Sequence, residues 1–516
     1  MASWMERLSD QELRRREELQ LLRQQGIEPY PYSYERTATI AQLRQGVLSQ
    51  PLEAFADVAL AGRIMVLRRM GKVTFADVQD ESGRLQVYFR ADDLGEHYKL
   101  LPLLDIGDII GARGFLFYTR TGELTLHVRS FQLLCKALRP IPVPKEVVDQ
   151  QGRRIRYDAF TDKEQRYRYR YLDLLVNPEV REIFRKRTHI IRAVRDFFDA
   201  RGWLEVETPV LQPVYGGANA RPFRTYFNAL DSYFYLRIAT ELYLKRLIVG
   251  GFEGVYEIGK NFRNEGIDRL HNPEFTALEL YVAYRDYEWM MELVEELLET
   301  VVRQVNGSLW LQRGGQKVEL RRPFRRVRWY DAVHEATGYD LRGCSIETLR
   351  EIAERLEIQV SPTVSEPKLL DEIFSTAVQP RLVEPTFVID YPLSLSPLAK
   401  RHRSVPGVAE RFELFLFGME IANAFSELND PIEQRQRLEQ QARWREKGDL
   451  EAMPLDEDFL RALEVGMPPT AGLGIGIDRL VMILTEQPTI RDVILFPHMR
   501  PAEPQDVEQV SATPET

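Results

Sequence analysis

Cysteines and long apolar runs are both scarce in this sequence of 516 residues. Its two cysteines, Cys135 and Cys344, lie far apart and outside any Cys-x-x-Cys pattern, which excludes a disulfide framework and a cysteine-built metal site. No apolar run approaches the ~20 residues of a membrane-spanning helix. The first ten residues are polar and lack the apolar centre of a signal peptide, so we expect a cytoplasmic protein with no membrane partner.

Positive charge is also in deficit, because 69 Lys and Arg stand against 78 Asp and Glu and give a formal net charge of −9. An acidic chain argues against nucleic-acid binding over the whole surface. The basic residues are unevenly distributed, however, and gather at residues 14–16, 63–72 and 153–170. A local surface for nucleic acid is therefore compatible with the global charge.

The first part of the chain predicts a helical extension followed by a small β-barrel. We expect the extension at residues 1–55, where Ser9 and Glu12 form a capping pattern at the start of a helix. Residues 56–145 contain five short β-rich runs separated by turn signals, with a helix expected after the third run. Five strands with a helix in that place are typical of an OB-fold β-barrel.

The rest of the chain predicts an α+β domain that follows a linker. We expect the linker at residues 146–179 and the domain at residues 180–501. Long amphipathic helices alternate there with strands in no regular βαβ rhythm, which favours an antiparallel sheet over a doubly wound fold. We expect a helical insertion at about 340–382 and a disordered tail at 502–516.

One segment, residues 254–260, has the spacing of a phosphate-binding P-loop. Asn261 follows it, however, where a Ser or Thr should bind Mg²⁺, and its middle is strand-like. We therefore reject a P-loop. No motif that pairs a nucleophile with a base stands out elsewhere.

A strand-like run, residues 255–262, leads through a charged turn into a second run. Continued past this run, period-two alternation places Arg263 and Glu265 on one face. In the second run, the side chains that share a face are Phe275, Ala277, Glu279 and Tyr281. An arginine, an aromatic ring and carboxylates on one sheet face indicate a site for a planar anionic ligand with an attached cation. The alternative is the solvated face of a hairpin.

A second group of acids lies among apolar residues. It contains Glu413 and Glu420, followed by Asn423, Phe425 and Glu427, which share a strand face. Carboxylates buried without partners are costly, so partners are implied. Mg²⁺ usually takes one or two carboxylates together with substrate phosphate. The alternative is a pair of surface salt bridges.

A glycine-rich run, residues 472–476, opens into an amphipathic helix. The missing side chains let a ligand approach the backbone closely. Arg479 then lies in the first helical turn, where the helix dipole attracts anions. Glycines beside helices often serve packing, so this run alone is a weak signal.

Together these segments resemble the signature motifs of class II aminoacyl-tRNA synthetases, and most closely those of the bacterial lysyl-tRNA synthetases. Motif 1 resembles residues 181–209, motif 2 residues 262–281 and motif 3 residues 472–479. The resemblance implies an antiparallel six-stranded catalytic sheet with flanking helices, an OB-fold that binds the anticodon, and a homodimer formed through motif 1. It also implies Mg²⁺ and the substrates ATP, L-lysine and tRNA(Lys), with lysyl-adenylate as the intermediate.

The resemblance also implies roles for individual residues. Arg263 and Arg479 would be catalytic, and Glu413 and Glu420 would ligate Mg²⁺. The implied ATP contacts are Arg263, Glu265, His271, Asn272, Phe275 and Arg479. The implied lysine contacts are Gly217, Glu241, Arg263, Glu279, Tyr281, Asn423, Phe425 and Glu427. The implied anticodon contacts are Arg68, Phe75, Gln86 and Glu123.

Three alternatives and two departures accompany this resemblance. An aspartyl- or asparaginyl-type synthetase is disfavoured by the acidic pocket, since an aspartate-specific relative would need arginine or lysine at the pocket floor, and the ligase that attaches lysine to elongation factor P lacks the barrel. A non-catalytic nucleic-acid-binding relative would be expected to lack Arg263, Arg479 or the metal carboxylates. The chain departs from the lysyl pattern at Leu270, where many bacterial members have arginine, and at Thr240, which replaces a proline; Arg269 is the nearest arginine to Leu270.

Overall fold

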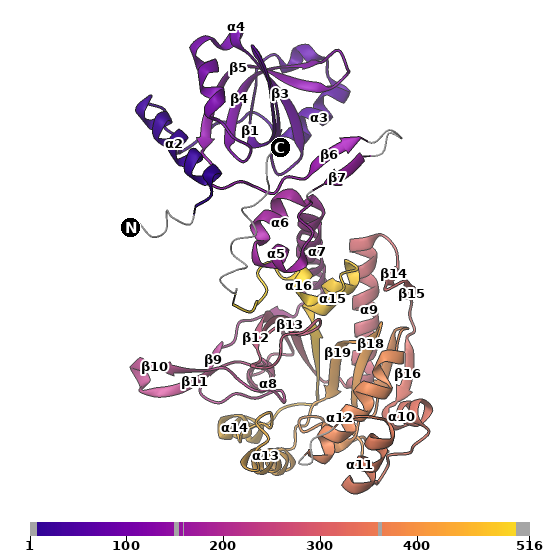
Figure 1. The fold of residues 1–516 in the computed structure, drawn as a ribbon. Helices are drawn as coiled ribbons and strands as arrows, with labels where there is room; N and C mark the ends of the chain where they lie inside the picture. Colours follow the sequence, from indigo (N-terminus) through magenta and orange to yellow (C-terminus); the bar gives the residue numbers. More distant parts are fainter. Residues whose placement is uncertain (1–7, 149–153, 158, 360–363, 502–516) are drawn as a thin grey trace. The chain divides into compact units, whose positions relative to one another are not determined.

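The computed structural model describes residues 8–148, 154–157, 159–359 and 364–501. The chain forms two compact units (Figure 1): residues up to Asn177 together with those from Arg500 onward, and Pro178–Met499. The tail predicted at 502–516 lies outside the described residues, as do the first seven residues of the predicted extension. Within the described ranges, no helix combines the length and the apolar character needed to span a membrane.

The first unit is built around a closed barrel with the strand order β1-β2-β3-β5-β4. The strands are β1 (Val58–Met70), β2 (Val73–Gln79), β3 (Arg84–Arg90), β4 (Ile109–Tyr118) and β5 (Leu124–Cys135). β3 and β5 pair in parallel, and the other neighbours are antiparallel. Inward residues such as Ile64, Val87 and Ile110 fill the barrel. The predicted OB-fold barrel is confirmed.

Short helices accompany the barrel. α2 (Asp10–Gln24) begins with the capping box predicted from Ser9 and Glu12. One helix is predicted between the third and fourth strands, but α4 (Ala91–Leu94) ends at Gly95, whose φ of 53° stops the α-helix, and 3-10 turns continue the segment. The remaining elements of the unit are α3 (Ile40–Ser49), η1 (Leu52–Phe55), η2 (Gly95–Leu103), β6 (Lys145–Val148), β7 (Arg154–Tyr157), α5 (Lys163–Arg168) and α6 (Arg170–Val176).

A buried ion cluster joins α2 to the barrel. The Lys136 side chain is 0% exposed, and its Nζ lies 2.7 Å from Asp105, 2.8 Å from Glu18 and 3.2 Å from Asp108. A buried charge needs partners of this kind. Because Glu18 belongs to α2, the cluster fixes that helix against the barrel.

The second unit contains a sheet of eight strands, ordered β16-β17-β18-β19-β20-β13-β12-β8. The six strands from β17 to β12 are antiparallel neighbours, which confirms the predicted sheet. A short parallel strand extends the sheet at each edge. The strands are β8 (Leu204–Glu205), β12 (Gly254–Phe262), β13 (Glu274–Ala283), β16 (Arg325–Arg328), β17 (Thr386–Ile389), β18 (Arg411–Leu416), β19 (Met419–Ser426) and β20 (Thr470–Gly476).

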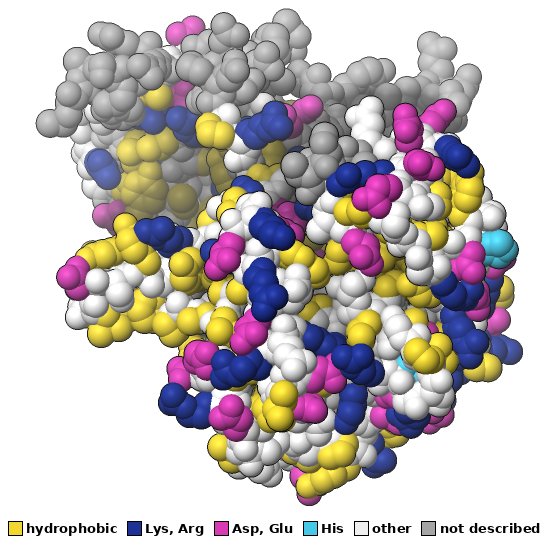
Figure 2. Space-filling model, turned by 90° about the horizontal axis from the view of Figure 1, so that it is seen from below, with side chains coloured by type: hydrophobic (Ala, Val, Ile, Leu, Met, Phe, Trp, Pro, Cys, Tyr) yellow, Lys and Arg dark blue, Asp and Glu magenta, His cyan; other side chains and the backbone are white. Residues whose placement is uncertain are grey.

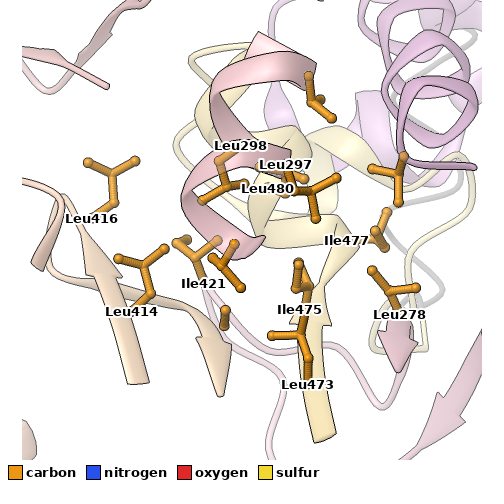
Figure 3. Close-up of a cluster of buried hydrophobic side chains, with 14 of the residues drawn as sticks. Leu278, Leu297, Leu298, Leu414, Leu416, Ile421, Leu473, Ile475, Ile477 and Leu480 are labelled. Atoms are coloured by element: carbon orange, nitrogen blue, oxygen red, sulfur yellow. The ribbon is translucent and has the colours of Figure 1, made fainter. Parts of the chain in front are cut away.

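The helices α7 (Pro178–Asp199), α9 (Tyr287–Asn306) and α15 (Ile477–Leu484) share the main hydrophobic core with this sheet. Figure 3 shows leucines and isoleucines from the strands meeting Leu297 and Leu298 of α9 and Leu480 of α15. Leu278 and Leu280 of β13 belong to this core, so period-two alternation turns their neighbours to the other face of the sheet. That other face carries the residues for which a common face is predicted: Phe275, Ala277, Glu279 and Tyr281.

Smaller elements complete the second unit. Three helices have a core of their own around Trp329 and Phe374: α10 (Trp329–Thr337), α11 (Ile346–Arg355) and α12 (Glu366–Ala377). A separate three-stranded sheet is formed by β9 (Leu211–Gln212), β10 (Arg224–Phe227) and β11 (Ser232–Leu236). The others are η3 (Asn228–Leu230), α8 (Glu241–Val249), β14 (Trp310–Arg313), β15 (Gln316–Glu319), η4 (Gln379–Arg381), η5 (Leu393–Leu395), α13 (Pro431–Glu446), α14 (Glu457–Val465) and α16 (Ile490–Val493).

Candidate functional site

Two cavities of about 650 and 300 Å³ adjoin each other on the sheet face that carries Glu279. The residues that line both are Arg263, Leu270, His271, Glu420 and Arg479. Motifs 2 and 3 therefore meet in space, as the sequence predicts. Leu270 lies in the wall, whereas Arg269 is exposed.

A group of buried carboxylates adjoins the larger cavity. Glu241, the first residue of α8, lines it; Glu279 on β13 lines the smaller cavity, and Glu427 follows β19. Tyr281 Oη donates a hydrogen bond to Glu279 Oε2 at 3.1 Å, and the Thr240 N–H donates to Glu279 Oε1 at 2.9 Å. Burial, and then the charge of Glu241, raises the pKa of Glu279 to about 7.

Lys245 is a member of this group that sequence reasoning missed. Its side chain is 0% exposed, and its Nζ forms ion pairs with Glu241 Oε1 at 2.5 Å and with Glu427 Oε2. Burial opposes its charge, but the carboxylates of Glu241 and Glu427 outweigh burial and raise the pKa of Lys245. The one signal in the sequence is the four-residue spacing from Glu241 on a helix.

One oxygen of Glu427 lacks a donor. Glu427 lies deeper than Glu241, with a side chain that is 0% rather than 7% exposed, and it lines neither cavity. Burial raises the pKa of Glu427 well above its usual range. Its Oε1 accepts no hydrogen bond from the residues that the structure describes. An unsatisfied buried acceptor is costly, so this oxygen is available to a further donor.

Two glycines make room for these carboxylates. Gly217 has a φ of 85°, and a Cβ there would lie 2.9 Å from the Glu241 Cβ. A Cβ on Gly472 would lie 1.8 Å from Glu427 Oε1 and 2.6 Å from the Tyr281 ring. The glycine of motif 3 is therefore required by the Glu427 carboxylate.

Arg263 forms no ion pair with a carboxylate of the described residues. Its guanidinium carbon lies 5.1 Å from the centroid of the Phe275 ring, and its one side-chain hydrogen bond in the described chain, 3.4 Å long, reaches the Ile238 carbonyl. Burial lowers the pKa of Arg263. Arg263 and Glu265 are predicted on a strand face, but β12 ends at the preceding residue because the chain turns there. Both still line the smaller cavity with Phe275.

Arg479 lies in the first turn of α15, as the sequence predicts. Its Nη1 donates to the Glu420 carbonyl at 3.0 Å and to Glu420 Oε2 at 3.1 Å. Its Nη2 lies 3.2 Å from His271 Nε2. Asn272 is buried beside them and lines the smaller cavity. The predicted nucleotide-binding residues are thus brought together.

The carboxylate of Glu413 has both oxygens engaged. Arg411 donates to Oε1 at 2.6 Å and Tyr391 Oη to Oε2 at 2.8 Å, while Arg411 Nε reaches the Asn423 side chain at 3.2 Å. Burial, and then the charge of Glu420, raises the pKa of Glu413 to about 7. Sequence reasoning missed Arg411, although it shares a strand face with Glu413. Across the described residues, no group of three metal-ligating side chains occurs.

The barrel carries a row of aromatic side chains across four strands. The Phe75 ring on β2 lies 5.0 Å from Tyr88 on β3, Tyr88 lies 5.0 Å from His127 on β5, and His127 lies 4.7 Å from Phe115 on β4. All four are half-buried and lie outside the barrel core. Phe75 is therefore not a core residue. Sequence reasoning found Phe75 but not its three neighbours.

The other predicted anticodon contacts lie on the same barrel. Arg68 on β1 is directly opposite Phe75 in the strand register. Gln86 and Tyr88 alternate on β3 and share a face. Glu123 is exposed just before β5. Three of the four predicted residues therefore surround the aromatic row, and Glu123 lies at the end of a strand.

Comparison with known proteins gives consistent matches. Residues 162–500 match the family model "tRNA synthetases class II (D, K and N)", and residues 58–134 match "OB-fold nucleic acid binding domain". The Lysine–tRNA ligase of Christiangramia forsetii is 52% identical over 511 residues, which cover 97% of this chain and 88% of that protein. The Lysine–tRNA ligase of Porphyromonas gingivalis is 50% identical over 512 residues, with the same coverage. The chain therefore belongs to the class II tRNA synthetases (D, K and N).

Proposed function

We propose that the chain is a lysine–tRNA ligase. It activates L-lysine with ATP to give lysyl-adenylate and pyrophosphate, and then transfers lysine to the 3′-terminal ribose of tRNA(Lys). The relatives at 52% and 50% identity carry that name. The observation that carries the proposal is the buried group of Glu241, Glu279 and Glu427, because a cationic amino acid gives these carboxylates the partners that their burial requires.

The carboxylates disfavour the other substrates of this family. The side chain of aspartate would bring a further negative charge beside three carboxylates, which is unfavourable at low dielectric. The side chain of asparagine would bring no charge to balance them. The ligase that acts on elongation factor P lacks an anticodon barrel, and this chain has one at residues 58–134.

The first chemical step needs no enzyme nucleophile, because the lysine carboxylate itself attacks the α-phosphate of ATP. We assign to Arg263 the contacts with the lysine carboxylate and the α-phosphate, since its buried guanidinium forms no ion pair with the described residues. Arg479 holds the γ-phosphate after exchanging its contacts with Glu420 and His271. The rate then comes from alignment and charge stabilisation.

The smaller cavity is assigned to the nucleotide. Phe275 supplies a ring on which adenine stacks, next to the Arg263 guanidinium. Glu265, His271 and Asn272 line the same cavity and contact the nucleotide.

The larger cavity and the buried carboxylates are assigned to lysine. The ε-ammonium is bound by Glu241, Tyr281 and Glu427. The α-amino group is bound by Glu279 and the Gly217 backbone. Asn423 and Arg263 bind the carboxylate, and Phe425 packs against the four-carbon stem. Two observations support these assignments. Lys245 forms ion pairs with Glu241 and Glu427 on one side of the group, and Glu427 Oε1 has no donor among the described residues.

Mg²⁺ is assigned to Glu413 and Glu420. Both line the larger cavity, and the charge of Glu420 acts on the pKa of Glu413. Two carboxylates suit Mg²⁺ when nucleotide phosphates complete its oxygen shell. When bound, the ion neutralises phosphate charge. Tyr391 and Arg411 hold Glu413 in place for this role.

The barrel is assigned to the anticodon of tRNA(Lys). Phe75 stacks on the central uridine, Gln86 hydrogen-bonds it, and Arg68 and Glu123 contact neighbouring positions. The aromatic row supports this assignment, because base stacking on an exposed ring contributes roughly 1–3 kcal/mol per base.

We further assign a homodimer interface to motif 1, residues 181–209, and a cytoplasmic location, where ATP and tRNA are available. Apolar side chains are exposed next to motif 1 at Val210, Leu211, Tyr226, Phe227, Leu230 and Tyr233. Figure 2 shows hydrophobic side chains gathered at the left, where Figure 1 places β10 and β11. Exposed apolar patches of this kind commonly mark contact surfaces.

The deciding experiment is ATP–pyrophosphate exchange with the full chain and one amino acid at a time. We expect exchange with lysine and none with aspartate or asparagine. Exchange with either of those but not with lysine would overturn the proposal. Transfer of radiolabelled lysine to tRNA, but not to elongation factor P, separates the synthetase from its paralogue, and sedimentation equilibrium tests the dimer.

A further inference from the structure

Lys245 has no role in the reaction as assigned so far, yet it is among the largest fully buried side chains. It does not line the cavity in which lysine is proposed to bind. Its ion-pair partner Glu241 does line that cavity, so Glu241 lies between the Lys245 ammonium and the proposed substrate. Burying a charged lysine side chain is costly unless partners of opposite charge compensate it.

The ammonium of Lys245 engages one oxygen of each carboxylate. It pairs with Oε1 of Glu241 and Oε2 of Glu427. Among the described residues, no donor reaches the second oxygen of Glu427, Oε1. A Cβ on Gly472 would lie 1.8 Å from this oxygen. The rings of Phe425 and Phe459 lie 5.5 and 5.8 Å from Nζ and exclude water from the pair.

The charges of the group balance only when Lys245 is counted. In their ionised forms Glu241, Glu279 and Glu427 carry three negative charges, and the ammonium of Lys245 carries one positive charge. Substrate lysine brings two ammonium groups, while its carboxylate faces Arg263. The neighbouring charged or titratable groups are Tyr281 on β13 and Arg411 on β18, which acts on Glu241.

We infer that Lys245 is a positioning residue for lysine recognition: its ammonium keeps Glu241 and Glu427 charged and turns their remaining oxygens toward the substrate ammonium. The inference rests on the proposed lysine pocket. Without Lys245 the bound state would bury an excess negative charge, so a carboxylate would hold a proton and lose its attraction for lysine.

The test compares Lys245→Met, which keeps the length but removes the charge, with Lys245→Arg, which keeps the charge. The readout is KM for lysine in ATP–pyrophosphate exchange between about pH 6 and 9. For Lys245→Met we expect KM for lysine to rise about 30-fold or more, while KM for ATP stays at the wild-type value. Loss of the cation raises the carboxylate pKa values, so the pH at which KM levels off moves upward by about one unit or more. Lys245→Arg restores the wild-type profile.

Three further variants separate the possible failures. Lys136→Met removes the other buried lysine, in the barrel, and should leave the profile unchanged. If Lys245→Met does not fold, Lys245→Gln keeps a donor without charge and should give the same shift. A wild-type pH profile in a folded neutral variant would overturn the inference. Glu427→Gln tests the pocket itself: if it leaves KM for lysine unchanged, the proposed pocket fails and the inference with it, whereas a raised KM together with a wild-type Lys245→Met profile sinks only the inference.

Discussion

The chain buries a lysine among carboxylates twice, once in each unit. Asp108, beside Lys136 in the barrel unit, and Glu427, beside Lys245 in the catalytic unit, both have side chains that are 0% exposed. Both Asp108 oxygens accept backbone hydrogen bonds, at 2.7 and 2.8 Å. Glu427 Oε1 has no donor among the described residues.

The difference teaches that a buried ion cluster is not by itself a functional site. In the Lys136 cluster both oxygens of the fully buried Asp108 are hydrogen-bonded, and the cluster joins a helix to the barrel. The Lys245 cluster borders a cavity of about 650 Å³ and leaves an acceptor unpaired. Structural ion pairs also shift pKa values, so an unpaired atom in a cluster that borders a cavity is the more specific indicator of ligand binding.

Substitution of Arg263 gives the largest expected effect on exchange. Like the unpaired Glu427 oxygen, the Arg263 guanidinium is a buried charged group with no ionic partner among the described residues. Arg263→Ala should lower exchange by about 100- to 1,000-fold or more, since one preorganised charge donor at the reacting centre is lost. The melting temperature of the variant should stay at the wild-type value, because no carboxylate of the described residues loses an ion-pair partner. An exchange rate within about threefold of wild type would contradict the assignment.

Substitution of Phe75 tests whether the barrel unit has a ligand-binding surface, the aromatic row, in addition to the ion cluster around Lys136. Phe75→Ala should lower kcat/KM for tRNA charging by about 5- to 150-fold, the effect of losing one stacked base, and leave exchange unchanged. Tyr118→Ala is the control, because Tyr118 is a barrel aromatic outside the row and is 49% exposed. Equal losses in exchange and charging would refute the anticodon role.

The pH dependence of lysine binding gives a smaller effect that sharpens the same comparison. Glu279 has a pKa of about 7, and its ionised form is the one that attracts an amino group. Affinity should therefore increase as pH rises through about 7, and KM for lysine should increase by up to about tenfold for each unit below it. Glu279→Gln should flatten this profile in exchange assays. A flat wild-type profile from about pH 6 to 8 would be inconsistent with this role.

Much of the fold follows from local pattern. The capping box at Ser9, the barrel strands and the antiparallel core of the catalytic sheet all have periodic or turn signals that act over a few residues. The edge strands β8 and β16 were missed because, at two and four residues, they are too short to show alternation. From Gly95 onward a 3-10 segment replaces the predicted helix, and the backbone conformation of Gly95 does not follow from side-chain periodicity.

The site was predictable where chemistry lies on a strand with a motif, and not where it depends on tertiary contact. Lys245 and Arg411 resemble surface charges in sequence, and only the packed structure shows their carboxylate partners. Tyr88, Phe115 and His127 join Phe75 because the barrel brings β3, β4 and β5 together. Pairing between distant strands leaves no mark on the local pattern of any one of them.

The most direct test of the account compares Glu427→Gln with Asp108→Asn, because each removes one charge from a buried carboxylate beside a buried lysine. The measurement is KM for lysine in exchange, with the melting temperature of each variant. The account predicts that Glu427→Gln raises KM by about 30-fold or more with little change in melting temperature. Asp108→Asn should lower the melting temperature and keep the wild-type KM. A similar rise of KM in both variants, or none in Glu427→Gln, would contradict the account.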